Sequence, residues 1–181
     1  MLPRGRPGRQ WVITDRVVYL STMDTIRFRL EGRRSLADPD VLAELTGRIE
    51  RMGPDARRRW GRMTPHQMLV HLAATHDAVL GRASFDTPAR SANRIIKAFV
   101  LHLPVRWVRN LNFGADPAGV AVDAAAFAVD RRRAAETLAE LADAGPRSFS
   151  TPHPILGPMS QSEWHRWAFL HTDHHLRQFG L

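Results

Sequence analysis

The C-terminal stretch of the chain carries three histidines whose type and spacing suit metal binding. His171, His174 and His175 lie in a segment of helical periodicity near the end of the sequence. At about 100° per residue, their side chains fall on one face of a helix together with those of Trp164 and Trp167, so this face is expected to be buried. Neutral imidazole is a common ligand of zinc and nickel, and histidines at positions i and i+4 can reach one ion together. The spacing of His171 and His175 fits that geometry.

Two alternatives remain open for these histidines. His171 also stands three residues before His174, a spacing that is compatible with shared ligation too. The histidines could instead be ordinary buried and exposed residues, each satisfied by a backbone carbonyl or a water molecule. Two imidazoles on one buried face are costly without a common purpose, and this cost favours a joint site for His171 and His175.

A third ligand would have to come from another helix, and residues 64–80 supply the candidates. The apolar positions of this segment place His71 at the edge of its buried face and His76 within that face, whereas His66 points away. Periodicity does not choose between His71 and His76. A site with two histidines from one helix and one from another would leave open positions on an ion, and open positions indicate catalysis or substrate binding.

Five helical segments are predicted from capping residues, apolar periodicity and terminators. The sharpest start signals are the capping boxes TPHQ at residues 64–67 and SQSE at residues 160–163. Because no convincing sheet accompanies them, the pattern predicts an all-α bundle. The predicted segments are residues 39–52, 64–80, 92–103 with a kink at Pro104 and a resumption over 105–111, 123–144, and a last helix that begins at the SQSE box.

Length and composition narrow the classes of protein. A chain of 181 residues fits one domain that is large enough to bury a hydrophobic core without disulfide bonds. It contains no cysteine, which excludes a disulfide framework, a thiolate zinc site and a cysteine nucleophile. Any metal must therefore be held by histidine, aspartate or glutamate.

The positive charge is concentrated at the N-terminus. Of the net charge of +8, residues 1–34 carry +5, with eight arginines against three acidic residues. Residues 1–22 are expected to form a disordered basic arm, or to be untranslated sequence ahead of a start at Met23. The arm contains PRGRPGR at residues 3–9, similar to the core of an AT-hook, so an alternative function is nucleic-acid association through this arm. The uneven charge argues against nucleic acid as the main partner.

Nothing in the sequence predicts a membrane segment. No apolar run has the length of a membrane span, and residues 11–20 are interrupted by Asp15 and Arg16. We therefore expect a soluble cytoplasmic protein with no membrane partner, in which residues 23–181 form the helical domain. Apolar bundle faces are compatible with a homodimer.

Three ordered blocks resemble the DinB-like (YfiT-like) superfamily, and more closely a bacterial subfamily of unknown function. The resemblance extends over residues 23–181. The blocks are WGRMTPHQMLVHL at residues 60–72, HPILG at residues 153–157 and HTDHHLRQFG at residues 171–180.

The resemblance implies an antiparallel four-helix bundle that binds a divalent metal, zinc or nickel. By position, its ligands would be His71, His171 and His175, which selects His71 over His76. Relatives include thiol-dependent S-transferases and a mycothiol-dependent isomerase. The implied function is a metal-dependent transferase or hydrolase that acts on a small-molecule substrate, with a low-molecular-weight thiol as cosubstrate; a non-catalytic metal-binding bundle is the alternative.

Three further residues are candidates for the site. His153 could orient substrate or act as an acid or base near the metal, or it could anchor its loop. His174 could be a catalytic residue that supports the ligands as a hydrogen-bond donor, or it could lie on the surface. Gln178 lies on the inner face of the last helix and could hydrogen-bond a bound cofactor or cap its own helix end.

Overall fold

The structure is a computed structural model. The predicted arm at residues 1–22 lies outside the described part of the chain, as does most of the predicted resumption of the third helix over 105–111. The described residues are 34–85, 94–102, 107, 109 and 117–181.

Every α-helix of the described residues corresponds to one predicted from the sequence, which confirms the all-α fold. Short 3₁₀ turns at Pro117–Gly119, Ala124–Ala126 and Pro146–Ser148 connect some of them. Within the described residues, strand pairing is limited to one isolated bridge between His153 and Gly157. The helices are α2 (Pro39–Glu50), α3 (Pro65–Val79), α4 (Arg94–His102), α5 (Phe127–Asp143) and α6 (Gln161–Gln178).

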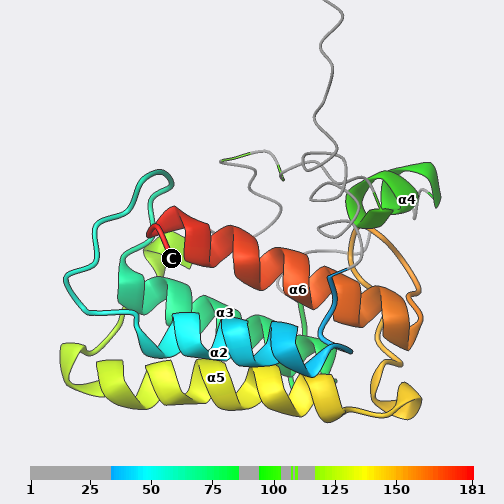
Figure 1. Cartoon of the computed structure of the whole chain (residues 1–181), viewed down its shortest axis with the longest axis horizontal. Coiled ribbons are helices and arrows are strands. Elements are labelled where there is room, and N and C mark those ends of the chain that lie inside the picture. The colour runs from blue at the N-terminus through cyan, green and yellow to red at the C-terminus, as the bar shows by residue number, and fades with distance from the viewer. Residues whose placement is uncertain (1–33, 86–93, 103–106, 108, 110–116) are drawn as a thin grey trace, which may run out of the picture.

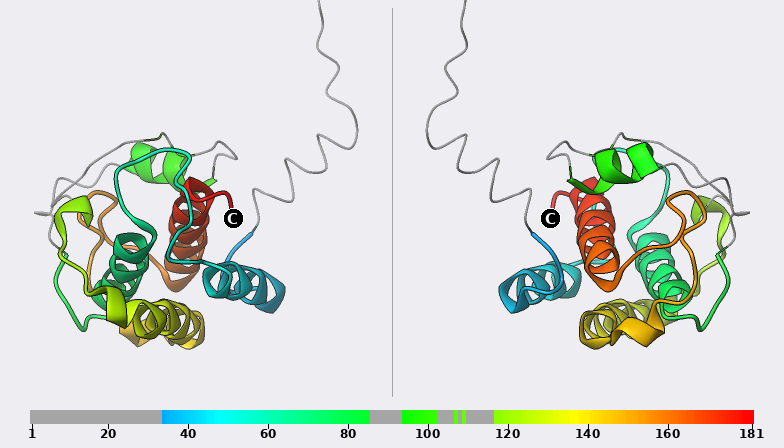
Figure 2. Two further views of the ribbon diagram at one scale, coloured as in Figure 1. Left: turned by 90° about the vertical axis from the view of Figure 1, so that its left-hand side faces the viewer. Right: turned by 90° about the vertical axis from the view of Figure 1, so that its right-hand side faces the viewer.

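Four of these helices form a bundle, and the fifth lies outside it. Seen end-on, α2, α5, α3 and α6 follow one another around a square (Figure 2). Helices α2 and α6 run in one direction and α3 and α5 in the other (Figure 1). The predicted antiparallel bundle is therefore confirmed as two helices opposed to two others. Because the long segment that contains α4 separates α3 from α5, these two neighbours can run the same way.

The capping boxes read from the sequence begin the two helices that carry the candidate ligands. The Thr64 hydroxyl accepts from the Gln67 N–H, and the Gln67 side chain accepts from the Thr64 N–H. Ser160 and Glu163 make the same reciprocal pair at the start of α6. These caps satisfy N–H groups that have no partner within the helix, and they fix where each helix begins.

The core lies between the four bundle helices. The apolar stripe predicted for α3 is inside, with Met68, Leu69 and Leu72 fully buried. Leu72 belongs to the same core cluster as Leu176 of α6. Burial of such side chains contributes about 1.5–3 kcal/mol each, so the core also fixes how α3 faces α6.

Helix α4 covers the first half of α6 from outside the bundle (Figure 1). Its Leu101 is fully buried, and the Leu101 carbonyl accepts from the Arg166 guanidinium at 2.9 Å. The ammonium group of Lys97 lies 2.9 Å from the Glu163 carboxylate. As a result, α6 is buried on its outer side as well as on the side that faces the bundle.

The polar face of α6 also holds a buried ion pair. The Asp173 carboxylate lies 2.8 Å from the guanidinium of Arg48 in α2 and 2.9 Å from that of Arg177. Arg48 donates in addition to the Leu181 carbonyl. Since breaking a buried pair leaves a charge without compensation, this contact ties the C-terminal end of the chain to α2.

No helix in the described residues has the length and apolar character that crossing a bilayer requires.

Candidate metal centre

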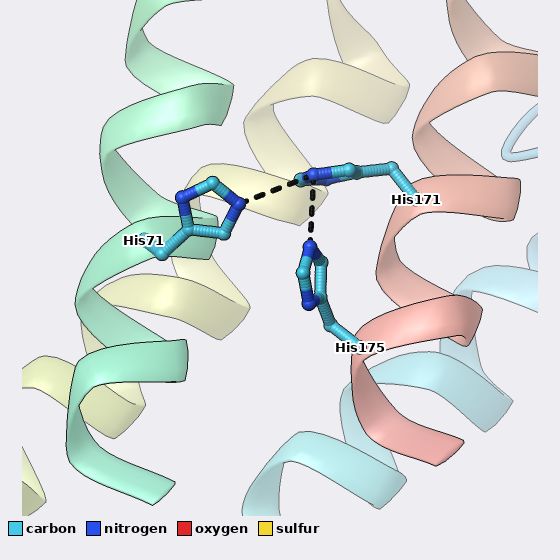
Figure 3. A group of neighbouring side chains, drawn as sticks. All are labelled: His71, His171 and His175. Atoms are coloured by element: carbon cyan, nitrogen blue, oxygen red, sulfur yellow. Dashed lines mark hydrogen bonds between the residues drawn. The ribbon is translucent and has the colours of Figure 1, made fainter. Parts of the chain in front are cut away.

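Three histidines from two helices converge inside the bundle. His71 comes from α3, and His171 and His175 come from successive turns of α6 (Figure 3). The Nε2 atom of His171 lies 3.3 Å from that of His71 and 3.1 Å from that of His175. One potential ligand atom of each residue lies within 4.8 Å of the other two. We call these three residues the histidine triad.

The spacing of the triad nitrogens matches ligands of one ion. Nitrogen ligands about 2.1 Å from zinc are about 3.0 Å apart at right angles and about 3.4 Å apart at the tetrahedral angle. The two measured separations, 3.1 and 3.3 Å, fall between these values. The donor set therefore fits a divalent ion such as zinc or nickel, as the family resemblance implies.

The electrostatics of the triad keep its imidazoles neutral. Burial lowers the pKa of His71 from 6.5 to about 4. The pKa values of His171 and His175 lie well below 6.5, first because of burial and then because the other histidines of the triad would repel a second positive charge. At neutral pH each ring therefore keeps a nitrogen lone pair, which is the form that binds metals.

The two triad histidines of α6 are held in different ways. The Nδ1 atom of His175 lies 3.0 Å from the Oε1 atom of Gln178. His171 instead stacks on the Trp167 ring, with centroids 4.6 Å apart and an angle of 11° between the planes. Among the described residues, its buried Nδ1 atom has no hydrogen-bond partner.

Aromatic rings surround His174 next to the triad. The His174 ring lies 5.4 Å from that of His175, 6.0 Å from that of Trp107 and 6.1 Å from that of Trp60, centroid to centroid. The Arg109 guanidinium lies over the Trp60 ring at 4.4 Å. Burial lowers the pKa of His174, and Arg177 and Arg109 lower it further while Asp173 opposes them. Sequence reasoning missed Trp107, because nothing in its local pattern indicates contact with His171 and His174, which are more than 60 residues away.

His153 does not join the triad. Its Nδ1 atom accepts from the N–H groups of Ile155 and Leu156 at 3.1 Å, and its backbone pairs with Gly157. Burial lowers its pKa to about 4. Its ring contacts Trp167, which in turn stacks on His171. The observed contacts are those of a residue that anchors its loop.

The two other histidines of α3 have hydrogen-bond partners outside the triad. His76 is fully buried between Thr137 of α5, 3.1 Å from its Nδ1 atom, and Thr172 of α6, 3.4 Å from its Nε2 atom. The prediction that His66 points away from the bundle is wrong, because its Nε2 atom lies 2.7 Å from the Asp130 carboxylate and its side chain is buried. The α5 partner that draws His66 inward is 64 residues away in the sequence, which local periodicity does not see.

A helical bundle with three histidines of two facing helices gathered at one point defines the class of protein. The sequence pattern of the DinB superfamily matches residues 37–179. The chain therefore belongs to the DinB superfamily, as the blocks in its sequence predicted. No match is found among curated proteins or among solved structures.

Proposed function

We propose that the protein is a metal-dependent enzyme in which His71, His171 and His175 hold a divalent ion, zinc or nickel. Its substrate would be a small molecule and its cosubstrate a low-molecular-weight thiol. The observation that carries the proposal is that the Nε2 atoms of three imidazole rings lie close together. Burial keeps these rings neutral. Membership of the DinB superfamily supports it.

The chemistry follows from the charge of such an ion. A divalent ion held by His71, His171 and His175 would keep its positive charge, because the imidazoles are neutral, and would lower the pKa of a thiol or water molecule bound to it. The protein must then accept the released proton. It must also keep competing water away from the reacting group.

His174 is the residue that the proposal assigns to proton transfer. Its pKa is lowered, so at neutral pH the ring is uncharged and can accept a proton. It stands beside His175 in the same helix, and the rings of Trp60 and Trp107 flank it. These indoles would limit the access of water on that side.

The proposal gives His153 and Gln178 no contact with substrate. The Nδ1 atom of His153 is already bound to two backbone N–H groups of its loop. The side-chain oxygen of Gln178, Oε1, is already hydrogen-bonded to His175. Both side chains are thus engaged in holding the site together.

Metal analysis tests the proposal directly. Wild-type protein should contain close to one divalent ion per chain, and His171→Ala should contain almost none. His102→Ala is the matched control, because His102 is an exposed histidine of α4 that is not part of the triad. Wild-type protein without stoichiometric metal would refute the proposal.

A second measurement separates an enzyme from a non-catalytic metal-binding bundle. Protein loaded with cobalt should develop a sulfur-to-cobalt charge-transfer band when cysteine is added as a probe thiol. This band requires an open position on the ion. A cobalt-loaded protein whose spectrum does not change when cysteine is added would therefore contradict the thiol-dependent function.

A further inference from the structure

The loop before α3 packs against the last residues of α6. The Arg59 N–H donates to the Gln178 carbonyl at 2.5 Å. Gly61 and Gly180 both have positive φ, 82° and 84°. A Cβ atom on Gly61 would lie 2.8 Å from Nε2 of Gln178, and one on Gly180 would lie 2.5 Å from the Arg59 guanidinium. Both glycines are therefore required by backbone conformation and by close approach of the other segment.

This contact encloses the side-chain amide of Gln178. The residue is only 6% exposed, with its Nε2 atom against Gly61 and its Oε1 atom 3.0 Å from Nδ1 of His175. A carbonyl oxygen can only accept a hydrogen bond. In this orientation, Nδ1 of His175 must carry the proton, and the lone pair must be on Nε2, the atom that faces the triad.

The opposite orientation of the amide would disable the ligand. If the amide were turned over, its NH₂ group would donate to Nδ1 of His175, and the ring proton would then occupy Nε2. A protonated Nε2 cannot bind a metal. The glycine at position 61 leaves the room in which the amide nitrogen lies, away from the imidazole.

We propose that Gln178, held in place by the loop at Gly61, is a positioning residue that fixes His175 as its Nδ1–H tautomer and aims Nε2 at the triad. The proposal rests on the proposed function of the triad. It explains why a buried glutamine occupies the α6 face that carries the histidines. It also gives a role to Gly61, which the function of the triad leaves unexplained.

The contrast with His171 makes this contact specific. Among the described residues, Nδ1 of His171 has no hydrogen-bond partner, and its ring orientation depends on stacking against Trp167. Gln178 sets the tautomer of His175, whereas the described part of the chain offers Nδ1 of His171 no such acceptor. Loss of the Gln178 acceptor should therefore weaken the site through His175.

The test compares three glutamine variants. Gln178→Met keeps the size of the side chain and removes the acceptor, whereas Gln178→Glu keeps an acceptor oxygen. Gln161→Met is the matched control, because Gln161 lies at the other end of α6 and donates to the Ala144 carbonyl. Zinc affinity is measured by competition with a chromophoric chelator, and the tautomer of His175 in metal-free protein by long-range ¹H–¹⁵N NMR.

We expect Gln178→Met to weaken zinc binding about 10- to 100-fold and to lose the single Nδ1–H tautomer of His175. Gln178→Glu and Gln161→Met should bind zinc as wild type does, and Gly61→Ala should weaken binding by displacing the amide. A Gln178→Met variant with wild-type affinity would overturn the inference.

The wild-type spectrum keeps the inference testable if a variant fails to fold. An Nε2–H tautomer of His175 in metal-free wild type would overturn it, and an Nδ1–H tautomer would support it. Wild-type protein that binds no zinc would refute the proposed metal function. In that event the NMR result would still decide whether Gln178 sets the tautomer.

Discussion

The histidine triad and His76 share helix α3, yet the ring nitrogens of the two have different kinds of partner. Both ring nitrogens of His76 lie within hydrogen-bond distance of a threonine hydroxyl. In the triad, three ring nitrogens point at one another, and Nδ1 of His171 has no partner in the described part of the chain. Burial is thus common to both regions, and the difference lies in the partners. A buried histidine with complete partners stabilises a fold, whereas buried histidines that face one another are candidate ligands of one ion.

The largest effect expected from this comparison concerns metal binding. His171→Ala should weaken zinc binding about 100- to 1,000-fold, because structural zinc sites with four protein ligands bind with about 10–16 kcal/mol, which corresponds to about 2.5–4 kcal/mol for each ligand. His76→Ala should leave zinc affinity nearly unchanged and lower the free energy of unfolding by about 2–4 kcal/mol through cavity formation and lost hydrogen bonds. Zinc titration and urea unfolding of both variants measure these effects. An equal loss of zinc affinity in His171→Ala and His76→Ala would contradict the distinction between a ligand and a structural histidine.

The next effect is loss of stability in acid. Burial lowers the pKa of His76 to about 3 and that of His153 to about 4 in the folded protein, against 6.5 when unfolded. Below pH 6.5 the unfolded chain therefore binds more protons, so stability is complete above about pH 6.5 and falls as the pH drops. Between pH 6.5 and 4.5, each residue should remove up to about 2.7 kcal/mol.

Urea unfolding of metal-free protein from pH 7.5 to 4.5 measures this loss. His76→Gln should flatten the dependence by the contribution of one histidine, and His102→Gln, at an exposed position, should leave the curve unchanged. A wild-type stability that stays constant down to pH 4.5 would contradict the assignment of His76 as a buried neutral ring.

A third effect separates the two regions by linkage. Zinc at 100 times its dissociation constant should raise the free energy of unfolding by about 2.7 kcal/mol, because the ion binds the folded chain. The stabilisation should disappear in His171→Ala and persist in His76→Gln. Thermal unfolding with zinc and with a chelator measures it, and stabilisation that survives in His171→Ala would indicate binding elsewhere.

The smallest effect concerns the partners of His76. Thr137→Val removes the hydroxyl that contacts Nδ1 of His76 while keeping the shape of the side chain. It should cost about 1 kcal/mol of stability and leave zinc affinity at the wild-type value. A change in zinc affinity would mean that His76 and the triad act as one unit.

Much of the fold could be predicted from the sequence because its signals are local. The capping boxes that begin α3 and α6, and the apolar stripe of α3, depend on residues a few positions apart. His66 was misplaced because its partner, Asp130, comes from α5. The buried ion pair between Arg48 and Asp173 likewise joins α2 to α6, and no local sequence pattern predicts it.

Less of the candidate site could be predicted from the sequence, because the third histidine belongs to a different helix from the other two. The i, i+4 spacing indicated His171 and His175 as a pair, but periodicity left His71 and His76 as equal candidates for the third position. Only the family resemblance favoured His71. In the structure the choice follows from how α3 faces α6, since this places His71 opposite His171 and directs His76 to Thr137 and Thr172.

The sequence by itself determined that this chain is helical, where its ligand-bearing helices begin and that two histidines share a face, because each of these depends on neighbours along one helix. Periodicity left open which histidine of α3 completes the triad, and the tertiary structure decided it. Only the tertiary structure shows that Gln178 contacts His175 and that Gly61 lies against the side-chain amide of Gln178. Those relations join segments as many as 117 residues apart, and they are set by how the bundle core orients its helices.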